Sequence, residues 1–414
     1  MTVLSSENVL RPGASGLKPR LVRMGMSAVP TVFRLLRRFY PIAKFGSLCV
    51  VTLHDDVREV FGTDAIFRAP YKANLDIITG NQPFFLGMDR TADYDTQVAC
   101  MQQVILPSDL PRIAADAESQ ATEIVSQSNG RVEVVDQLVR RVTFDVLARY
   151  FGISEPEVGR LDVWATRLFE FQFTGSPNDK ALMREVSEIA PAFRAHIDHE
   201  IARRKEIMAA DDRDDVMARC LKHQNAGDTV YTDEMIRTSI LCMVVGGPPQ
   251  PPMVVPQAIE QLLRRPDAWK AACAAAEKSD DDRLWKILRE AMRFDPLAPG
   301  LPRTATQAWT IAKGTKRARE VSEGNTVIAA FASAMMDERR VADPGRFDAN
   351  RPDRDYLHFG HGLHECFGRH INRAMLHRII KPLLRQPNVR RAAGAEGHLR
   401  KNGAFAERLV VEFG

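Results

Sequence analysis

The sequence predicts a mainly α protein with minor β structure, folded as a single domain. Helical patterns dominate from about residue 95 to residue 275, where apolar residues recur at three- and four-residue spacing. Short β-branched segments lie nearer the two ends of the chain, at 47–53, 304–335 and 399–414. Because no repeat or linker divides the 414 residues, we expect a flexible N-terminal arm over 1–20 and one domain over 21–414.

The composition is that of an ordinary globular protein. A hydrophobic fraction of 45% and a net charge of +4 give no reason to expect a nucleic-acid partner. No run of about 18 apolar residues exists, so we expect no transmembrane segment. The six cysteines are scattered and form no CxxC pair, which favours a reducing compartment and a cytoplasmic location.

The N-terminal elements alternate between helix and strand. Residues 30–40 form an amphipathic, arginine-rich helix, which either lies on a membrane surface or packs as a plain surface helix. The strand at 47–53 and a short helix at 55–61 follow. The main helical patterns then cover 92–104, 113–126, 134–151, 157–171, 179–209 and 232–245.

A helix that begins after Thr232 runs into a proline-rich break. Thr232 is a suitable N-cap, and Asp233 and Glu234 lie in the first turn. The pattern then reaches Gly246-Gly247-Pro248-Pro249-Gln250-Pro251-Pro252, and helical spacing resumes from Val255 to Leu263. Prolines remove backbone donors, so we expect irregular backbone here, and such backbone is often functional.

The next helix carries a candidate ion pair. Ser279 and Asp282 resemble a capping box at its start, and the helix ends before Pro296. Glu290 and Arg293 lie three residues apart on one helical face, close enough to pair. On spacing alone, a solvated surface pair is the default interpretation.

The stretch 359–368 reads F-G-x-G-x-H-x-C-x-G with every fixed position filled. Gly360, Gly362 and Gly368 allow sharp turns and close approach of a flat ligand. A helix over 371–380 follows, so we expect its N-terminus to stabilise a Cys366 thiolate. Two other interpretations stay open: a zinc site made of His358, His361, His364 and Cys366, or a structural turn with a free cysteine.

This stretch resembles the haem-binding loop of the cytochrome P-450 family, soluble bacterial type. The resemblance covers the chain from about residue 45 onward and implies the single-domain fold of that family, with haem b as cofactor. It implies that Cys366 is the axial iron ligand and that His364 and Phe359 lie against the macrocycle. It further implies that Arg303 pairs with a haem propionate, and that Glu290, Arg293 and Arg346 form a structural network.

The chain departs from the family pattern at two places. Gly246 and Gly247 align with small residues that make room for oxygen, but Pro249 and Gln250 stand where the family usually has an acid and a threonine. Neither residue relays protons. The helix at 92–104 has Tyr94 and Val98 where the family often has a propionate-binding His and Arg, and it contains no Lys or Arg.

The resemblance therefore implies more than one activity. The first is monooxygenation of an apolar organic substrate, with electrons from NAD(P)H through a reductase. A ferredoxin partner is doubtful, because helix 92–104 lacks basic residues, although Arg369, Arg373 and Arg378 offer a second basic patch. The alternatives are a hydroperoxide isomerase or lyase, a peroxygenase, and a non-catalytic haem-based binding protein. The sequence does not reveal the substrate.

Overall fold

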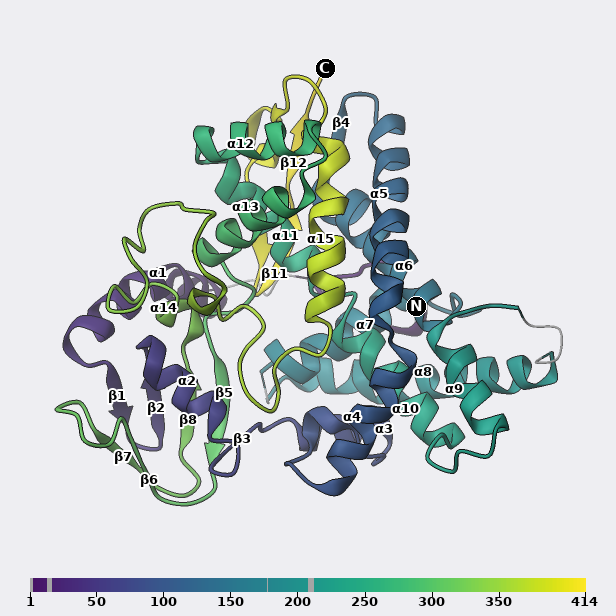
Figure 1. The fold of residues 1–414 in the computed structure, drawn as a ribbon, viewed down its shortest axis with the longest axis horizontal. Coiled ribbons are helices and arrows are strands. Elements are labelled where there is room, and N and C mark those ends of the chain that lie inside the picture. The colour runs from purple at the N-terminus through teal and green to yellow at the C-terminus, as the bar shows by residue number, and fades with distance from the viewer. Residues whose placement is uncertain (1–2, 13–16, 177, 208–211) are drawn as a thin grey trace. The chain divides into compact units, whose positions relative to one another are not determined.

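The computed structural model describes residues 3–12, 17–176, 178–207 and 212–414, and confirms a mainly helical fold with small sheets (Figure 1). The chain forms two compact units. Unit 1 comprises residues 1–11, 71–256 and 370–414, and unit 2 comprises residues 12–70 and 257–369.

Unit 1 consists mostly of helices. They are α3 (Lys72–Thr79), α4 (Ala92–Val104), α5 (Leu110–Gln127), α6 (Arg141–Phe151), α7 (Leu161–Phe169), α8 (Lys180–Glu206), α9 (Val216–Asn225), α10 (Asp233–Gly246) and α15 (Arg369–Leu384). Shorter turns of helix are η1 (Val3–Ser5), η2 (Phe85–Gly87), η3 (Pro107–Asp109), η4 (Val134–Arg140), η5 (Glu170–Thr174) and η8 (Gly394–Gly397). Thr91 and Thr232 cap α4 and α10 through their side chains, so the expected N-cap at Thr232 is confirmed.

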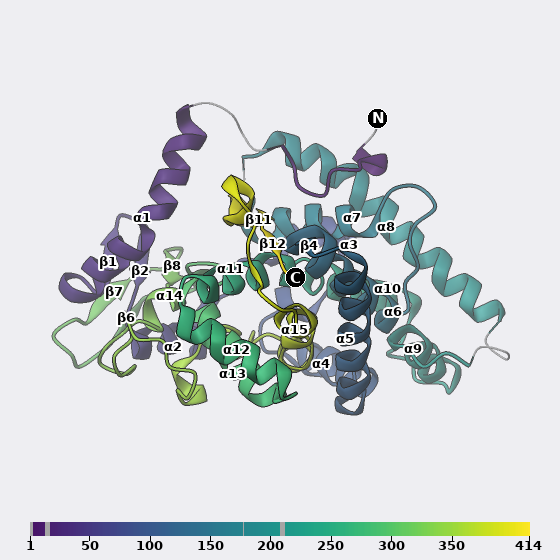
Figure 2. The ribbon, with the colours of Figure 1, turned by 90° about the horizontal axis from the view of Figure 1, so that it is seen from above.

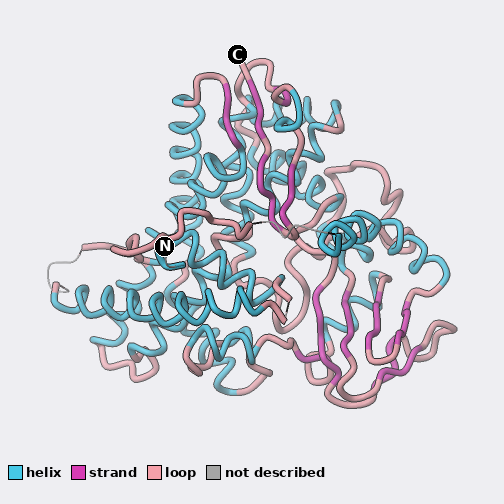
Figure 3. The backbone as a smooth tube through the Cα atoms, turned by 180° about the vertical axis from the view of Figure 1, so that it is seen from behind, coloured by secondary structure: helices cyan, strands magenta, loops and turns pink. Residues whose placement is uncertain are grey.

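Two small sheets complete unit 1, and both are visible in magenta in Figure 3. The first has the order β4 (Arg131–Glu133), β12 (Val410–Glu412), β9 (Arg390–Arg391), and all its pairings are antiparallel. The second is the hairpin of β10 (Arg400–Asn402) and β11 (Phe405–Arg408). The β structure expected over 399–414 is therefore confirmed by β10, β11 and β12.

Buried polar groups tie the helices of unit 1 together. Arg219 donates to both oxygens of Asp109, and the Tyr150 hydroxyl donates to the same carboxylate at 2.9 Å. Residues 3–11, which the sequence places in an N-terminal arm, contact this unit. Arg11 pairs with Glu170 and Asp179, and Arg167 donates to the carbonyl of Val9.

Unit 2 is built on a five-stranded sheet. Its order is β1 (Ile42–Phe45), β2 (Leu48–Val51), β8 (Thr326–Ala329), β5 (Leu301–Ala305), β3 (Phe67–Arg68), and only β2 and β8 run parallel. A separate hairpin pairs β6 (Trp309–Ile311) with β7 (Arg319–Val321). The helices are α1 (Leu17–Phe39), α2 (His54–Gly62), α12 (Pro266–Glu277), α13 (Asp281–Phe294), α14 (Phe331–Ala334) and η7 (Asp353–Asp355).

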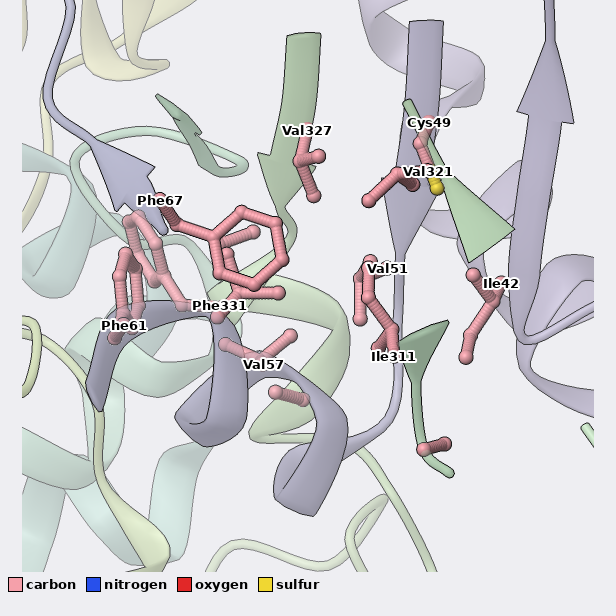
Figure 4. Packing of buried hydrophobic residues seen from close by; sticks show 14 of the residues in the cluster. Ile42, Cys49, Val51, Val57, Phe61, Phe67, Ile311, Val321, Val327 and Phe331 are labelled. Atoms are coloured by element: carbon pink, nitrogen blue, oxygen red, sulfur yellow. The ribbon is translucent and has the colours of Figure 1, made fainter. Parts of the chain in front are cut away.

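The core of unit 2 fills the space between this sheet and α2 (Figure 4). Val57 and Phe61 of α2 pack with Val51, Phe67 and Val327 from the strands, and all are nearly inaccessible to solvent. Burial of such side chains is the main stabilising term. The core therefore fixes α2, and the backbone of Phe61 in this helix lies against Gly362 of the cysteine loop.

Helix α11 (Pro251–Leu263) follows the proline-rich break, as expected. The expected capping box at Ser279 is wrong. Ser279 has a φ of 55° and its N–H bonds to the carbonyl of Ala276, so it ends α12 instead. Asp280 caps α13, and its carboxylate accepts the N–H of Arg283 at 3.0 Å.

Candidate functional site

The cysteine loop lies in unit 2 and is closed by its own backbone. The N–H of Cys366 donates to the carbonyl of Phe359 at 2.8 Å, and the N–H of Glu365 donates to Gly362 at 3.0 Å. Both turns are tight, and α15 begins at Arg369, directly after the loop. A helix therefore follows the cysteine loop directly, as the sequence predicts.

Two glycines are required for different reasons. Gly360 and Gly362 have φ values of 74° and 79°, in the left-handed region that glycine tolerates best. A Cβ on Gly362 would also collide with the backbone carbonyl of Phe61 in α2. At Gly360 the nearest atom to such a Cβ is 3.8 Å away, so only the backbone conformation requires glycine there.

The Cys366 thiol is less acidic than the sequence suggests. Burial raises its pKa to about 11, although a hydrogen bond from the Gly368 N–H and the charge of Arg369 act in the opposite direction. The expected stabilisation of a thiolate by the following helix is therefore outweighed by desolvation. Ionisation of Cys366 needs a close positive charge, and a bound metal ion would supply one.

The three histidines near Cys366 do not form a zinc site. His358 is half-buried, its Nε2 lies 3.0 Å from the carbonyl of Arg289, and desolvation lowers its pKa to about 3. His361 lies beside Arg58, with 3.4 Å between Nε2 and Nη2. Within the described ranges, no group of three His, Cys, Asp or Glu residues could hold a metal ion. The zinc interpretation is thus excluded for these residues.

Arg303 and His364 lie close enough to affect each other. Arg303 belongs to β5, is buried, and its guanidinium carbon lies 4.9 Å from the centre of the Phe61 ring. Burial lowers the pKa of His364 to about 4, and the charge of Arg303 lowers it further. A buried guanidinium beside a neutral imidazole makes a pair of donors suited to a carboxylate.

Glu290 and Arg293 form a fully buried, bidentate pair rather than a surface pair. Arg293 donates through Nε and Nη2 at 2.9 and 2.8 Å, and neither side chain is accessible to solvent. The third member is Arg351, whose Nε lies 3.2 Å from Glu290 Oε1. The prediction of Arg346 is wrong, because its side chain is exposed and pairs with Asp348.

The same carboxylate anchors the segment that leads to the cysteine loop. Glu290 also accepts the Tyr356 hydroxyl at 3.0 Å and the Asp348 N–H at 2.9 Å. Arg289, one residue earlier, places its guanidinium 4.0 Å from the Tyr356 ring. Glu290 of α13 therefore bonds to the chain both before residue 350, at Asp348, and after it, at Arg351 and Tyr356. Sequence reasoning missed Arg351 and Tyr356; the one available cue was Pro352, which favours extended backbone at Arg351.

The second predicted segment lies in unit 1, at the break between α10 and α11. The N–H of Gly247 bonds to Met243 O at 2.9 Å, and the N–H of Gln250 bonds to Gly247 O at 3.2 Å. The Gln250 side-chain amide donates to the carbonyl of Gly246. Pro248 and Pro249 have no N–H to offer the carbonyls of Val244 and Val245. The Gln250 N–H bonds to Gly247 O, three residues earlier, and the Gln250 side chain bonds to Gly246 O, which this N–H would reach in a regular helix.

Gly246 leaves open space beside the helix end. A Cβ built on Gly246 would meet nothing within 4 Å, whereas one on Gly247 would lie 2.9 Å from Met243 O. The role of Gly246 and Gly247 in making space for a small ligand stays a prediction. Pro249 is buried and Gln250 is half-buried.

Three basic residues of α15 share one carboxylate. Arg378, Lys381 and Arg385 all bond to Glu118 of α5. Lys381 is buried, whereas Arg378 and Arg385 are partly exposed. Helix α4 has the expected bounds and, as the sequence shows, contributes no Lys or Arg.

Comparison with known proteins decides the family. A family model for cytochrome P450 matches residues 165–395, more than half of the chain. The chain belongs to the cytochrome P450 family. It is 26% identical over 64% of its length to cyclomarin C epoxidase CymV of Salinispora arenicola, and 25% identical over 79% to the erythromycin C-12 hydroxylase of Saccharopolyspora erythraea.

These P450 relatives are only partly spanned by the chain, which covers 63% of the epoxidase and 80% of the hydroxylase. The ligand-free structure of cytochrome P450 TbtJ1 matches with a TM-score of 0.77 and 20% identity, covering 94% of this chain and 98% of that one. This likeness confirms the P450 fold. The family is one of haem-thiolate oxidoreductases and binds haem b.

The residues of unit 2 fit that cofactor. The loop offers one cysteine, and a thiolate is a suitable ligand for iron. Buried Arg303 and half-buried His364 offer donors for a propionate. Gly360 and Gly362 keep the loop free of side chains at its turns. The set matches a thiolate-ligated haem and not a zinc ion.

Proposed function

We propose that this P450 is a haem-thiolate monooxygenase that acts on an apolar organic small molecule, with Cys366 as the axial ligand of haem iron. The observation that carries this proposal is the self-closed cysteine loop, with its left-handed Gly360 and Gly362, in a chain of this family. The printed names of the two relatives, an epoxidase and a hydroxylase, support oxygen transfer.

Each residue near the loop has a role in this proposal. The thiolate of Cys366 makes the iron suited to O–O bond cleavage. The Gly368 N–H donates to Cys366 Sγ and moderates its negative charge. Arg303 and His364 would hold the cofactor through a propionate, and Phe359 would pack beside it. Glu290, Arg293 and Arg351 hold the preceding segment and act as positioning residues.

A second candidate function follows from the helix break. The family usually relays protons through an acid and a threonine just after the two glycines, but here Pro249 has no donor. Gln250 has no titrating group and uses its amide on Gly246 O. An enzyme that cleaves an O–O bond already present in its substrate needs no such relay. This favours a hydroperoxide isomerase or lyase, or a peroxygenase.

Two experiments separate these candidates. In the first, the purified haem-loaded ferric protein is mixed with a polyunsaturated fatty-acid hydroperoxide without reductant, and products are followed. Fast catalytic loss, well above that with free haem, supports the peroxide-using function. In the second, NAD(P)H with a surrogate ferredoxin and reductase is added with apolar substrates. Coupled product formation supports the monooxygenase.

Two further outcomes matter. If both assays fail while apolar ligands still shift the haem spectrum saturably, the protein is a haem-based binding protein. We also propose where an electron donor would dock. A ferredoxin or reductase would meet the cations of α15, since α4 has no Lys or Arg. All six cysteines are free, which supports a reducing, cytoplasmic location. Among the described residues, no helix is long and apolar enough to span a membrane.

A further inference from the structure

Exposed apolar side chains gather on one part of unit 2. Eleven large apolar residues of the described chain are exposed, and six of them lie within 17 consecutive positions. We call these six the α1–hairpin surface: Val32, Leu35, Phe39, Tyr40, Phe45 and Leu48. Single exposed apolar residues are ordinary, but a contiguous group marks an interaction surface.

The apolar side chains of α1 that belong to this surface are exposed because the helix packs through another face. Val32, Leu35 and Phe39 follow i, i+3, i+7 spacing and share one side of the helix. Arg37 lies away from that side and donates through Nη1 to Ser333 Oγ at 3.0 Å. The helix is therefore anchored to unit 2, and Leu35 and Phe39 remain 53% and 61% exposed.

The hairpin extends the same surface. Phe45 and Leu48 are direct partners at the tip of β1 and β2, and Phe45 is 63% exposed. Figures 1 and 2 show that α1 runs straight into this hairpin. A shallow hollow of about 660 Å³ joins the two, lined by Leu36, Tyr40, Ile42, Ala43, Lys44, Phe45, Gly46 and Arg319.

Basic residues outnumber acidic ones along this segment. From Ala28 to His54 the sequence contains four Lys or Arg residues and no Asp or Glu, and the exposed acid Glu320 of β7 lies beside Lys44. Arg34, Arg38 and Lys44 are exposed within or beside the apolar stripe. Arg319, exposed on β7, adds a cation at the edge of the hollow. A purely apolar partner would leave these cations without counter-charge.

We propose that the α1–hairpin surface docks on a membrane that contains anionic lipid. Aromatic and aliphatic side chains would enter the headgroup boundary, where Tyr40 keeps its hydroxyl in water. Arg34, Arg38 and Lys44 would meet the phosphate and carboxylate groups of the lipids. The attachment is peripheral, and it does not depend on the proposed enzymatic reaction.

The test measures binding of the haem-loaded full chain to vesicles of phosphatidylcholine, with and without phosphatidylglycerol, by co-sedimentation. We expect binding only with phosphatidylglycerol, and weaker binding at high salt because screening reduces the attraction. The double variant Leu35→Ser/Phe39→Ser should bind about a hundredfold more weakly, because each buried side chain contributes a factor of about ten. Arg34→Gln/Arg38→Gln should lose about tenfold at low salt.

The control variants replace exposed apolar or arginine side chains on unit 1, away from the α1–hairpin surface. Val158→Ser removes an apolar side chain of similar exposure (59%) from unit 1, and Arg149→Gln/Arg184→Gln removes two other exposed arginines. These controls should bind like the parent protein. All variants lie on the surface, and an unchanged ferrous carbonyl spectrum confirms that each is folded.

Three results would overturn the proposal. One is no binding to either vesicle, and another is binding that Leu35→Ser/Phe39→Ser leaves unchanged. The third is a lipid-free dimer that the same double variant dissociates, since this surface would then be an interface between two copies of the chain.

Discussion

The cysteine loop of unit 2 and the helix break of unit 1 differ in how their backbone hydrogen bonds are formed. In the loop, glycines adopt left-handed conformations, and main-chain bonds such as Cys366 N–H to Phe359 O close the turns. At the break, prolines remove main-chain donors, and the side chain of Gln250 bonds to Gly246 O instead. The loop matches its family pattern at every fixed position, whereas the break does not.

This difference separates what the fold requires from what the chemistry requires. The loop must present one thiolate in any P450, so its backbone and its anchor on α13 tolerate little change. In the proposal above, the break bears on proton supply, a requirement that differs between oxygen-activating and peroxide-using enzymes. The loop therefore identifies the family, whereas the break bears on whether the oxidant is dioxygen or a peroxide.

The largest expected effect is at Cys366. Cys366→Ser should abolish the thiolate-type spectrum of the ferrous carbonyl complex, because a serine oxygen is a different ligand. Cys273→Ser is the matched control, since Cys273 is also free and partly accessible. A Cys366→Ser protein that keeps the thiolate spectrum would refute the ligand assignment.

The next effect tests the anchor of the loop. Glu290→Ala should lower the free energy of unfolding by about 3–5 kcal/mol, because it leaves two buried guanidinium groups without their carboxylate. Urea unfolding measures this change, and haem loss should accompany it. Arg351→Ala should also be strongly destabilising, whereas Arg346→Ala should have little effect. The reverse order of the two arginines would contradict the corrected network.

A pH effect follows from His358. Its pKa is about 3 in the folded protein and near 6.5 when unfolded, so the unfolded chain binds the proton more readily. The stability from this group is full above about pH 6.5 and falls as the pH drops toward 3. At about pH 4.5 the loss should reach roughly 2–3 kcal/mol.

His358→Gln removes this titration while its amide can still bond to Arg289 O. Unfolding measured at neutral pH and at about pH 4.5 should show a smaller decline for this variant than for the parent protein. His398→Gln, at an exposed position, serves as control. Equal declines for parent and His358→Gln would show that His358 is not held neutral by burial.

Features that depend on residues close in sequence could be predicted, whereas contacts between segments distant in sequence could not. The loop, the limits of α4 and the Glu290–Arg293 pair follow from spacing along one segment. Arg351 could not be chosen over Arg346 on sequence, because the choice depends on how the chain after α14 folds back on α13. The rise in the Cys366 pKa could not be predicted for a similar reason: burial is a property of the whole fold, whereas the helix start is local.

The smallest expected effect concerns Gln250. Gln250→Thr should lower the free energy of unfolding by about 1 kcal/mol, since the bond to Gly246 O is lost. It should not create efficient reductant-coupled oxygenation, because Pro249 still has no donor at the preceding position. Coupling is measured as product formed per NAD(P)H consumed, and Gln127→Thr at the exposed end of α5 is the control. Strongly coupled turnover in Gln250→Thr would show that a single hydroxyl completes the relay, and the helix break would then no longer favour a peroxide-using enzyme.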